Sequence, residues 1–408
     1  MESLKAVAFD PAIPRYLWTR AWGGLRRSGY WGRWSPLQLR ELPVPEPRGP
    51  GWARIRTLLA GICGSDLNLV ALRDSPVASV YSSFPFVVGH EGVGRIDEAG
   101  PQVPFPRGQR VVVDPLLGCE TRGIDPPCPA CARGEISQCE RMAQGDLAPG
   151  LLIGACRDTG GTWGEYFLAH RSQIFPVPEQ VNDEAAALAE PFAVALHAVL
   201  RNRPRPGERV LVIGAGVIGL LVVAALKALG EPAPVTVLAR HPFQAELARE
   251  LGADRVLVGR GAGQREQLAR ELGVRLLRPI LGAPVPESGA DLVYECVGRD
   301  DSIDEALRFT RPGGRVVLVG LAGVTRRVDW TFVWMRELTV RGTFAYATEE
   351  VGGERTRTFQ LALELLARGG LPLERLVTHR FPLTQVRAAL ETAMSKAARQ
   401  ALKVLLVP

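Results

Sequence analysis

The sequence lacks any hydrophobic segment long enough to cross a membrane. Its one long uncharged run, Val210 to Leu226, is interrupted by Gly214, Gly216 and Gly219, whereas a spanning helix needs about 20 continuous apolar residues. The first residues, 1–7, have the pattern of a β-strand and carry no signal peptide. We therefore expect a chain without a membrane partner.

Acidic residues are absent from residues 11–40, a stretch with six arginines, four tryptophans and two tyrosines. This N-terminal extension accounts for the whole formal net charge of +6, so the rest of the chain is close to neutral. Arginine interleaved with aromatic rings is typical of a nucleic-acid or membrane surface, and equally of an extension packed on the body or on a neighbouring subunit. Because catalytic motifs lie elsewhere, a nucleic-acid partner is not expected.

Cysteines are few and odd in number: the chain has seven, four of them between positions 119 and 139. Cys128 and Cys131 have the two-residue spacing of a zinc knuckle, and Cys119 and Cys139 flank them. Four thiolates can close a tetrahedral structural zinc site, whereas disulfides are not expected in a chain without a secretion signal. Asp125 is the alternative to Cys119, because an insertion separates Cys119 from Cys128. The clustering favours reducing cytoplasm as the compartment.

A length of 408 residues allows two domains with full cores, and 46% hydrophobic and 23% charged residues are typical of a globular protein. Short strands at 52–58, 92–96 and 110–113, with no long helix between them, predict a β-rich domain over the first ~170 residues.

This β-rich region contains the residues of a candidate catalytic zinc site. Cys63 and His90 offer a thiolate and an imidazole, and Glu91 and Glu190 are the candidates for the third ligand. Ser65 follows Cys63 closely and could pass a proton from a substrate hydroxyl. Asp66 is placed to orient His90 by contacting it without binding the metal itself. The alternative is that Cys63 is simply a buried cysteine and that His90 is an unrelated histidine. The motifs in the rest of the chain favour the zinc site over this alternative.

Residues 183–200 are rich in alanine and predict one helix, with Glu190 near its middle and Pro191 kinking it. His197 lies seven residues after Glu190 and so shares its face. We interpret His197 as a packed helical side chain rather than as a ligand.

From Gly207 the pattern changes to alternating strands and helices. The strand 210–213 leads into Gly214-Ala215-Gly216-Val217-Ile218-Gly219, which opens a helix, and further strands are expected at 235–238, 255–258, 292–296, 315–319 and 340–343. A glycine-rich turn in this context indicates a Rossmann-type dinucleotide-binding domain, in which the glycines let the backbone approach a pyrophosphate.

The end of the second strand of this series bears on the choice of cofactor. An NAD site would have an acidic residue there for the ribose 2′-hydroxyl, but the sequence has Ala239 followed by Arg240 and His241. Arg240 could hold a 2′-phosphate, so NADP is favoured over NAD. Val297 and Leu321 complete the residues expected to contact the cofactor.

With these motifs in place, the chain resembles the zinc-dependent medium-chain dehydrogenase/reductase family from about residue 40 onward. The resemblance rests on Gly61-Ile62-Cys63-Gly64-Ser65-Asp66, Gly89-His90-Glu91-Gly92 and Glu190-Pro191. It implies an α/β protein with a GroES-like β-rich catalytic domain at 1–190, including the structural zinc lobe at 119–139. A Rossmann doubly wound parallel sheet domain would follow at 191–343, and 344–408 would return to the catalytic domain.

The resemblance is to the polyol and sugar dehydrogenase variant, in which a glutamate accompanies the equivalents of Cys63 and His90. Three features depart from the family pattern: the insertion in the cysteine lobe, the N-terminal extension, and Asn68. Many members have a histidine in place of Asn68 that carries the proton outward. Trp163, Trp334 and the loop 71–84 are candidates for shaping the substrate pocket.

The implied function is zinc-dependent hydride transfer between a nicotinamide cofactor and an alcohol/carbonyl pair, the alcohol being a polyol, a sugar or a simple alcohol. We also expect a homo-oligomer, either a dimer or a tetramer. One alternative is a zinc-independent enone or quinone reductase of the same fold. The other is a non-catalytic protein that binds NADP, or nucleic acid through the N-terminal extension.

Overall fold

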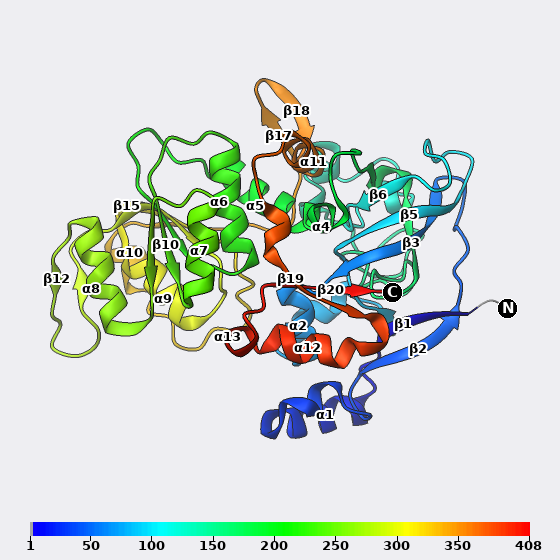
Figure 1. Ribbon diagram of the computed structural model, residues 1–408, viewed down its shortest axis with the longest axis horizontal. Coiled ribbons are helices and arrows are strands. Elements are labelled where there is room, and N and C mark those ends of the chain that lie inside the picture. Colours follow the sequence, from blue (N-terminus) through cyan, green and yellow to red (C-terminus); the bar gives the residue numbers. More distant parts are fainter. Residues whose placement is uncertain (1–2) are drawn as a thin grey trace. The chain divides into compact units, whose positions relative to one another are not determined.

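The computed structural model describes residues 3–408, and these form two compact units (Figure 1). The first unit runs to Glu190 and includes Tyr346–Arg368 and Leu376–Pro408, and the second comprises Pro191–Ala345 and Gly369–Arg375. Residues 344–345 and 369–375 thus group with the second unit, although the sequence placed them in the returning segment. Among residues 3–408 we find no helix whose length and apolar content would let it traverse a bilayer.

The first unit is built on two sheets. The strands of the larger sheet are β3 (Trp52–Gly61), β5 (Gly92–Ala99), β6 (Arg110–Val113), β7 (Tyr166–His170), β8 (Ile174–Pro176), β19 (Val377–Pro382) and β20 (Lys403–Val407). Their order is β19-β20-β3-β5-β6-β8, with β7 paired to β3. The smaller sheet has the order β2-β1-β4, formed by β2 (Leu37–Pro43), β1 (Ser3–Phe9) and β4 (Phe86–Val87).

The longest helices of this unit are α1 and α11, with 13 and 11 residues. They are α1 (Ile13–Leu25), α2 (Gly64–Val70), α3 (Pro129–Ala132), α4 (Asp183–Ala186), α11 (Thr358–Arg368), α12 (Val386–Met394) and α13 (Lys396–Arg399). Single 3-10 turns are η1 (Arg27–Trp31), η2 (Pro76–Tyr81), η3 (Glu120–Arg122), η4 (Ile136–Gln138), η5 (Arg171–Gln173) and η7 (Leu383–Gln385), and β17 (Thr348–Val351) and β18 (Glu354–Arg357) form a hairpin. As expected, no long helix lies between the strands predicted at 52–58 and 110–113, where α2 has seven residues. The N-terminal extension contains the 13-residue helix α1, which the sequence analysis did not predict.

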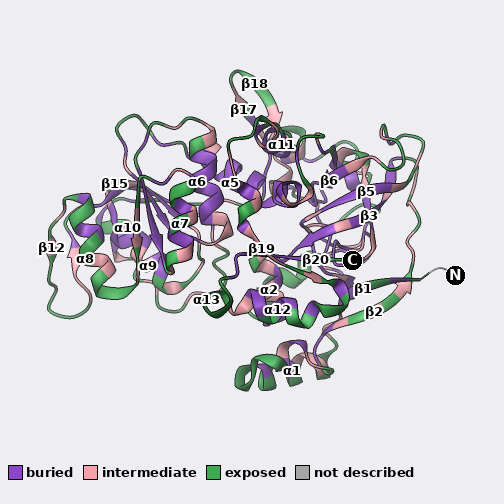
Figure 2. Ribbon diagram, viewed as in Figure 1, coloured by how far each residue is buried: buried purple, intermediate pink, exposed green. Residues whose placement is uncertain are grey.

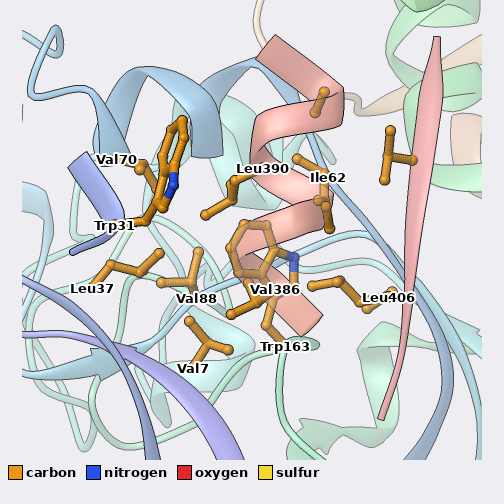
Figure 3. Packing of buried hydrophobic residues seen from close by; sticks show 14 of the residues in the cluster. Val7, Trp31, Leu37, Ile62, Val70, Val88, Trp163, Val386, Leu390 and Leu406 are labelled. Atoms are coloured by element: carbon orange, nitrogen blue, oxygen red, sulfur yellow. The ribbon is translucent and has the colours of Figure 1, made fainter. Parts of the chain in front are cut away.

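One hydrophobic core of the first unit joins segments that are far apart in the sequence. Figure 3 shows Trp31, Val70 and Leu390 close together, and Trp163 near Leu406 on the last strand. A second core lies on the other strands of the large sheet, around Phe167. Burial of these side chains is the main favourable term in folding this unit.

The second unit contains a parallel sheet with the strand order β11-β10-β9-β14-β15-β16. Its elements are β9 (Val210–Ile213), α6 (Val217–Ala228), β10 (Val235–Ala239), α7 (Pro242–Glu250), β11 (Arg255–Val258), α8 (Gly261–Leu272), β14 (Ala290–Glu295), α9 (Asp300–Arg308), β15 (Thr310–Leu318), α10 (Thr331–Met335) and β16 (Thr339–Gly342). A small hairpin, β12 (Leu276–Leu277) and β13 (Val285–Pro286), precedes β14, and η6 (Leu373–Leu376) follows later. Because the strand order reverses between β9 and β14, a ligand crevice is expected at their carboxyl ends. This is the predicted doubly wound sheet.

The predicted single helix over 183–200 is instead two helices, α4 and α5 (Ala189–Leu200). The break falls at 187–188, so Glu190 lies in the first turn of α5 and not near the middle of a helix. Pro191 also lies in this first turn, where a proline removes only an N–H that has no intrahelical partner, so no kink is expected from it.

Candidate active site and cofactor site

Three strands of the first unit bring the candidate metal ligands together. β3 leads directly to Cys63, and it pairs with β5, where Gly92 lies opposite Ala60 and the N–H of Gly61 donates to the carbonyl of Glu91. On its other side β3 pairs with β20, the last strand. Residues separated by more than 300 positions therefore meet at the end of β3.

Cys63, His90 and Glu91 form a group whose ligand atoms all lie within 4.8 Å of one another. A thiolate, an imidazole and a carboxylate are ligands that zinc accepts, and three protein ligands leave a fourth position open. A side chain at Gly61 would collide with the Glu91 carboxylate, so this close arrangement requires glycine there. Glu190 is not a member of the group.

Asp66 is outside this group of ligands and contacts both Cys63 and His90. Its Oδ2 accepts a 2.8 Å hydrogen bond from the backbone N–H of Cys63, which is the N-cap of α2, and its Oδ1 lies 3.5 Å from Nδ1 of His90. Burial raises the pKa of Asp66 to about 6, although the neighbouring His90 opposes that shift. This is the orienting position that the sequence suggested.

A buried lysine lies beside the anionic groups of the site. Lys403 on β20 and Glu91 form an ion pair in which both side chains are at most 2% exposed. Burial, the largest single influence, would lower the pKa of Lys403, but Glu91, Cys63 and Glu190 together outweigh it, and the net shift is upward. Burial would likewise lower the pKa of His90, but Asp66 and a hydrogen bond with Cys63 raise it well above its usual value.

Glu190 lies close enough to this cluster to interact with it electrostatically. Burial raises its pKa to about 7, His90 opposes the shift, and Glu91 adds to it. Its carboxyl group shares a hydrogen bond with Tyr346, whose hydroxyl is buried and has a strongly raised pKa. Glu190 is therefore a buried carboxyl group close to the predicted ligands.

The hydroxyl of Ser65 is shielded from solvent and has no hydrogen-bond partner within residues 3–408. A buried hydroxyl normally has a partner, so an unpaired one in a metal-ligand turn fits a site that receives a substrate hydroxyl. Asn68 follows on the same helix, α2, where many family members have the relay histidine.

The four cysteines of the predicted structural lobe also come together. The ligand atoms of Cys119, Cys128, Cys131 and Cys139 lie within 4.8 Å of one another, and the group does not include Asp125. A hydrogen bond with Cys131 lowers the pKa of Cys139 to about 5, and the same bond raises the pKa of Cys131. Thiols that share protons in this way fit the four-thiolate site of a structural zinc.

A buried arginine holds this lobe to the rest of the unit. Arg122 is fully buried, and its guanidinium donates to the backbone carbonyls of Leu117, Leu147 and Gly150 at 2.9, 3.1 and 2.5 Å. No sequence motif indicates this role, because the partners are backbone atoms.

In the second unit, the glycine-rich turn has the geometry of a pyrophosphate site. Gly214 has a φ of +100°, and a side chain at Gly219 would collide with the carbonyl of Gly214, so both positions require glycine. At Gly216 nothing lies within 4 Å of the position that a Cβ would occupy, which leaves room for a ligand. The turn ends at the N-terminus of α6, which favours an anion.

The remaining predicted cofactor residues border this turn and the next strands. Arg240 is exposed directly after Ala239, and His241 is the N-cap of α7, with burial and Arg240 lowering the pKa of His241. Val297 contacts the position where a Cβ of Gly214 would be. Leu321 is half exposed on the loop after β15.

Sequence reasoning missed Lys403 and Tyr346 and misjudged Trp163. A single lysine within the apolar run 401–407 was a signal, since a charge in a buried strand needs a partner. Trp163 is fully buried and its Nε1 donates a 3.0 Å bond to the Gly61 carbonyl, so it supports the end of β3 and does not line a pocket. His197 is buried and outside both candidate metal groups.

Known protein families match two successive parts of the chain separately. Residues 49–179 match the family model of the alcohol dehydrogenase GroES-like domain, and residues 217–368 match that of zinc-binding dehydrogenases. Human sorbitol dehydrogenase is 30% identical over 87% of this chain and 89% of its own length. The chain belongs to the zinc-dependent medium-chain dehydrogenase/reductase family.

Solved structures of this family share both parts of the fold. A zinc-binding dehydrogenase from Sinorhizobium meliloti 1021, bound to NADP, superposes with a TM-score of 0.71 at 26% identity over 100% of both chains. An alcohol dehydrogenase from Escherichia coli CFT073 with NADH has a TM-score of 0.73 at 25% identity, again over 100% of both chains. The protein is therefore an alcohol dehydrogenase-type oxidoreductase that uses zinc and a nicotinamide cofactor.

Proposed function

We propose that this protein oxidises a polyol, or another alcohol with a neighbouring hydroxyl, to the carbonyl compound and catalyses the reverse reduction. The observation that carries the proposal is the group of Cys63, His90 and Glu91 beside the unpaired hydroxyl of Ser65. The similarity to sorbitol dehydrogenase supports a polyol as the substrate class.

Each residue of the site has a distinct role in this proposal. Cys63, His90 and Glu91 would hold the catalytic zinc, and Asp66 would fix the His90 ring through its Nδ1 side. Ser65 would accept the proton of the substrate hydroxyl and pass its own proton to water or to the cofactor ribose. Glu190 lies beside these ligands, with its pKa raised to about 7 by burial.

Zinc when bound supplies Lewis acidity, worth on the order of 10 kcal/mol if its effect on an alcohol matches that on water. A positioned general base by itself typically supplies about 3–5 kcal/mol, or ~10²–10⁴-fold. Ser65 therefore positions the substrate and conducts its proton, but cannot by itself account for the activation. The nicotinamide, when bound, would supply the acceptor for the hydride of the carbinol carbon.

For the cofactor we propose NADP in preference to NAD. The position after β10 that would hold an acidic residue in an NAD site is Ala239, and the guanidinium of Arg240 next to it is exposed and available to a 2′-phosphate. Cys119, Cys128, Cys131 and Cys139 would hold a second, structural zinc.

We also propose a cytoplasmic location and a homo-oligomeric state, dimer or tetramer. All seven cysteines are free thiols in the structure, which suits a reducing compartment.

The decisive experiment combines zinc content with a fluorescence titration against NADPH and NADH. We expect two zinc ions per chain and tighter binding of NADPH, followed by turnover with members of a polyol panel. A chain that binds NADPH but holds one zinc and reduces enones or quinones would instead be the zinc-independent reductase.

The variant Cys63→Ser tests the catalytic zinc directly. It should lose one zinc ion and turnover but keep its circular dichroism spectrum and its affinity for NADPH, because Cys63 belongs to the first unit and the glycine-rich turn to the second. Undiminished turnover in a variant that has lost this zinc would contradict the proposal.

A further inference from the structure

Helix α1 is packed with its apolar side outward. Its buried residues are Thr19 and Gly23, whereas Ile13, Leu17 and Leu25 are 60–78% exposed and Trp18 and Trp22 are 52% and 42% exposed. At 100° per residue these five side chains fall on one half of the helix, and Thr19 and Gly23 on the other. A helix of a globular protein normally has the opposite arrangement.

The orientation of α1 is fixed by close contacts on its small side. A side chain at Gly23 would collide with the ring of Tyr30, and one at Gly29 would lie 2.8 Å from Trp22 Cδ1, so the helix packs tightly on η1. Trp31, the last residue of η1, is buried in the core of the first unit. Figure 2 shows α1 at the edge of this unit, mostly in the colour of exposed residues. The apolar face is therefore held outward by the fold.

Arginines border this apolar face. Arg20 is exposed at one side of the face, and Arg26, the C-cap residue of α1, is exposed at its C-terminal end with its guanidinium 6.0 Å from the ring centroid of Trp22. Trp18 and Trp22 stack on each other, with ring centroids 6.0 Å apart and planes at 16°. A little further along the chain, Arg33 lies over the exposed ring of Trp34. Tryptophan, leucine and isoleucine on one face with arginine along its edges is the pattern of a helix that lies in a bilayer interface.

We propose that α1 docks this protein on an anionic lipid bilayer, with Ile13, Leu17, Leu25 and the two tryptophans entering the headgroup boundary. Arginine near the surface then pairs with acidic lipid headgroups. The sequence alone led us to expect no membrane partner. The burial pattern of α1 changes that expectation, because an extension that packed on the body would have turned these side chains inward.

Two other occupants fit the face less well. A second copy of this chain would bring together two stretches that contain six arginines and no acidic residue over 11–40. Like charges across a contact are unfavourable, whereas an anionic surface complements them. Nucleic acid would also complement the charge, but its bases stack on aromatic rings, and three of the five exposed side chains are aliphatic.

The test uses the full-length, zinc-loaded protein in co-sedimentation with vesicles of phosphatidylcholine alone or with about one third phosphatidylglycerol. We expect binding to the anionic vesicles only, a blue shift of tryptophan fluorescence on binding, and weaker binding as salt is raised. The variant Trp18→Ser/Trp22→Ser should bind at least roughly tenfold more weakly. Its matched control is Ile280→Ser/Leu281→Ser, which removes two highly exposed apolar side chains from a loop of the second unit and should bind normally.

The charge is tested separately with Arg20→Gln/Arg26→Gln, which should lose roughly fivefold in affinity for each arginine removed. The exposed pair Arg260→Gln/Arg278→Gln has the same change in net charge and should keep most of the affinity.

Three results would overturn the proposal. The first is binding that is absent, or equal for neutral and anionic vesicles. The second is a wild-type dimer in light scattering that Trp18→Ser/Trp22→Ser converts to monomer, which would assign the face to a second copy. The third is an oligonucleotide that binds at physiological salt and prevents vesicle binding.

Discussion

At the scale of single residues, the candidate site depends on a buried charge that no local motif contains. Lys403 and Glu91 are 312 positions apart and form an ion pair that is almost completely excluded from water. Such a pair contributes little net stability as a whole, but removal of one partner leaves an uncompensated buried charge. Lys403 is therefore as necessary to the site as the predicted ligands.

We predict that Lys403→Met destabilises the zinc-free protein by about 3–5 kcal/mol, because the Glu91 carboxylate is then buried alone. The measurement is urea unfolding after chelation. Lys403→Arg retains the charge and serves as the control. A loss below about 1 kcal/mol would mean that Glu91 is protonated or hydrated in the folded state.

Arg240 is the residue on which the proposed cofactor preference depends. Arg240→Ser should weaken NADPH binding by roughly 10–100-fold, because one or two charge-assisted hydrogen bonds to the 2′-phosphate are lost. NADH has no 2′-phosphate, so its binding should be unchanged. Arg249→Ser removes an exposed arginine from α7 and is the control for net charge. Equal effects on the binding of NADPH and NADH would mean that Arg240 is a solvated loop residue that does not set the cofactor preference.

At the scale of elements, the cysteine lobe is a segment with little secondary structure of its own. It contains only single turns, η3, α3 and η4, and a small core made of the cysteines and a few neighbours. A cluster of this size cannot offset the conformational entropy of its loop, so a bound metal has to supply the difference.

We predict that Cys131→Ser loses one zinc ion and makes residues 119–139 sensitive to proteolysis, while the second unit stays folded. Zinc content and mapping of limited-proteolysis fragments are the measurements. Cys156→Ser is the matched control, because Cys156 is a buried free cysteine of the same unit that lies outside the lobe. Zinc loss in both variants would show a general loss of structure rather than loss of a metal site.

At the scale of the whole molecule, the two units have separate cores and separate proposed ligands. Both candidate metal groups belong to the first unit, and the glycine-rich turn belongs to the second. A ligand that binds only the native state stabilises by mass action, by about 2.7 kcal/mol at a hundred times its dissociation constant.

Hydrogen exchange should therefore distinguish the units. Chelation of zinc should speed exchange in the first unit, in β3, α2 and the cysteine lobe. Saturating NADPH should slow it mainly in the second unit, around β9 and α6. Slower exchange around Cys63 but not around β9 on adding NADPH would mean that the glycine-rich turn is not the cofactor site.

Much of the fold could be predicted because its signals are local. The strands β6, β9 and β11 have the predicted bounds, and the glycine-rich turn between β9 and α6 follows from chemistry within a few residues. The helix pair α4 and α5 and the outward face of α1 were missed. Their arrangement depends on which neighbours pack against them, which periodicity alone does not specify.

The sequence by itself determined the kinds of group at the site: thiol, imidazole and carboxylate in glycine-rich turns, four clustered cysteines, and a glycine-rich turn of the kind expected to accept a pyrophosphate. Those properties are encoded in residues close together in the chain. Only the tertiary structure decided that Glu91 rather than Glu190 lies with Cys63 and His90, and that Lys403 balances it. The reason is that β3 is paired with β5 on one side and with β20, from the far end of the chain, on the other.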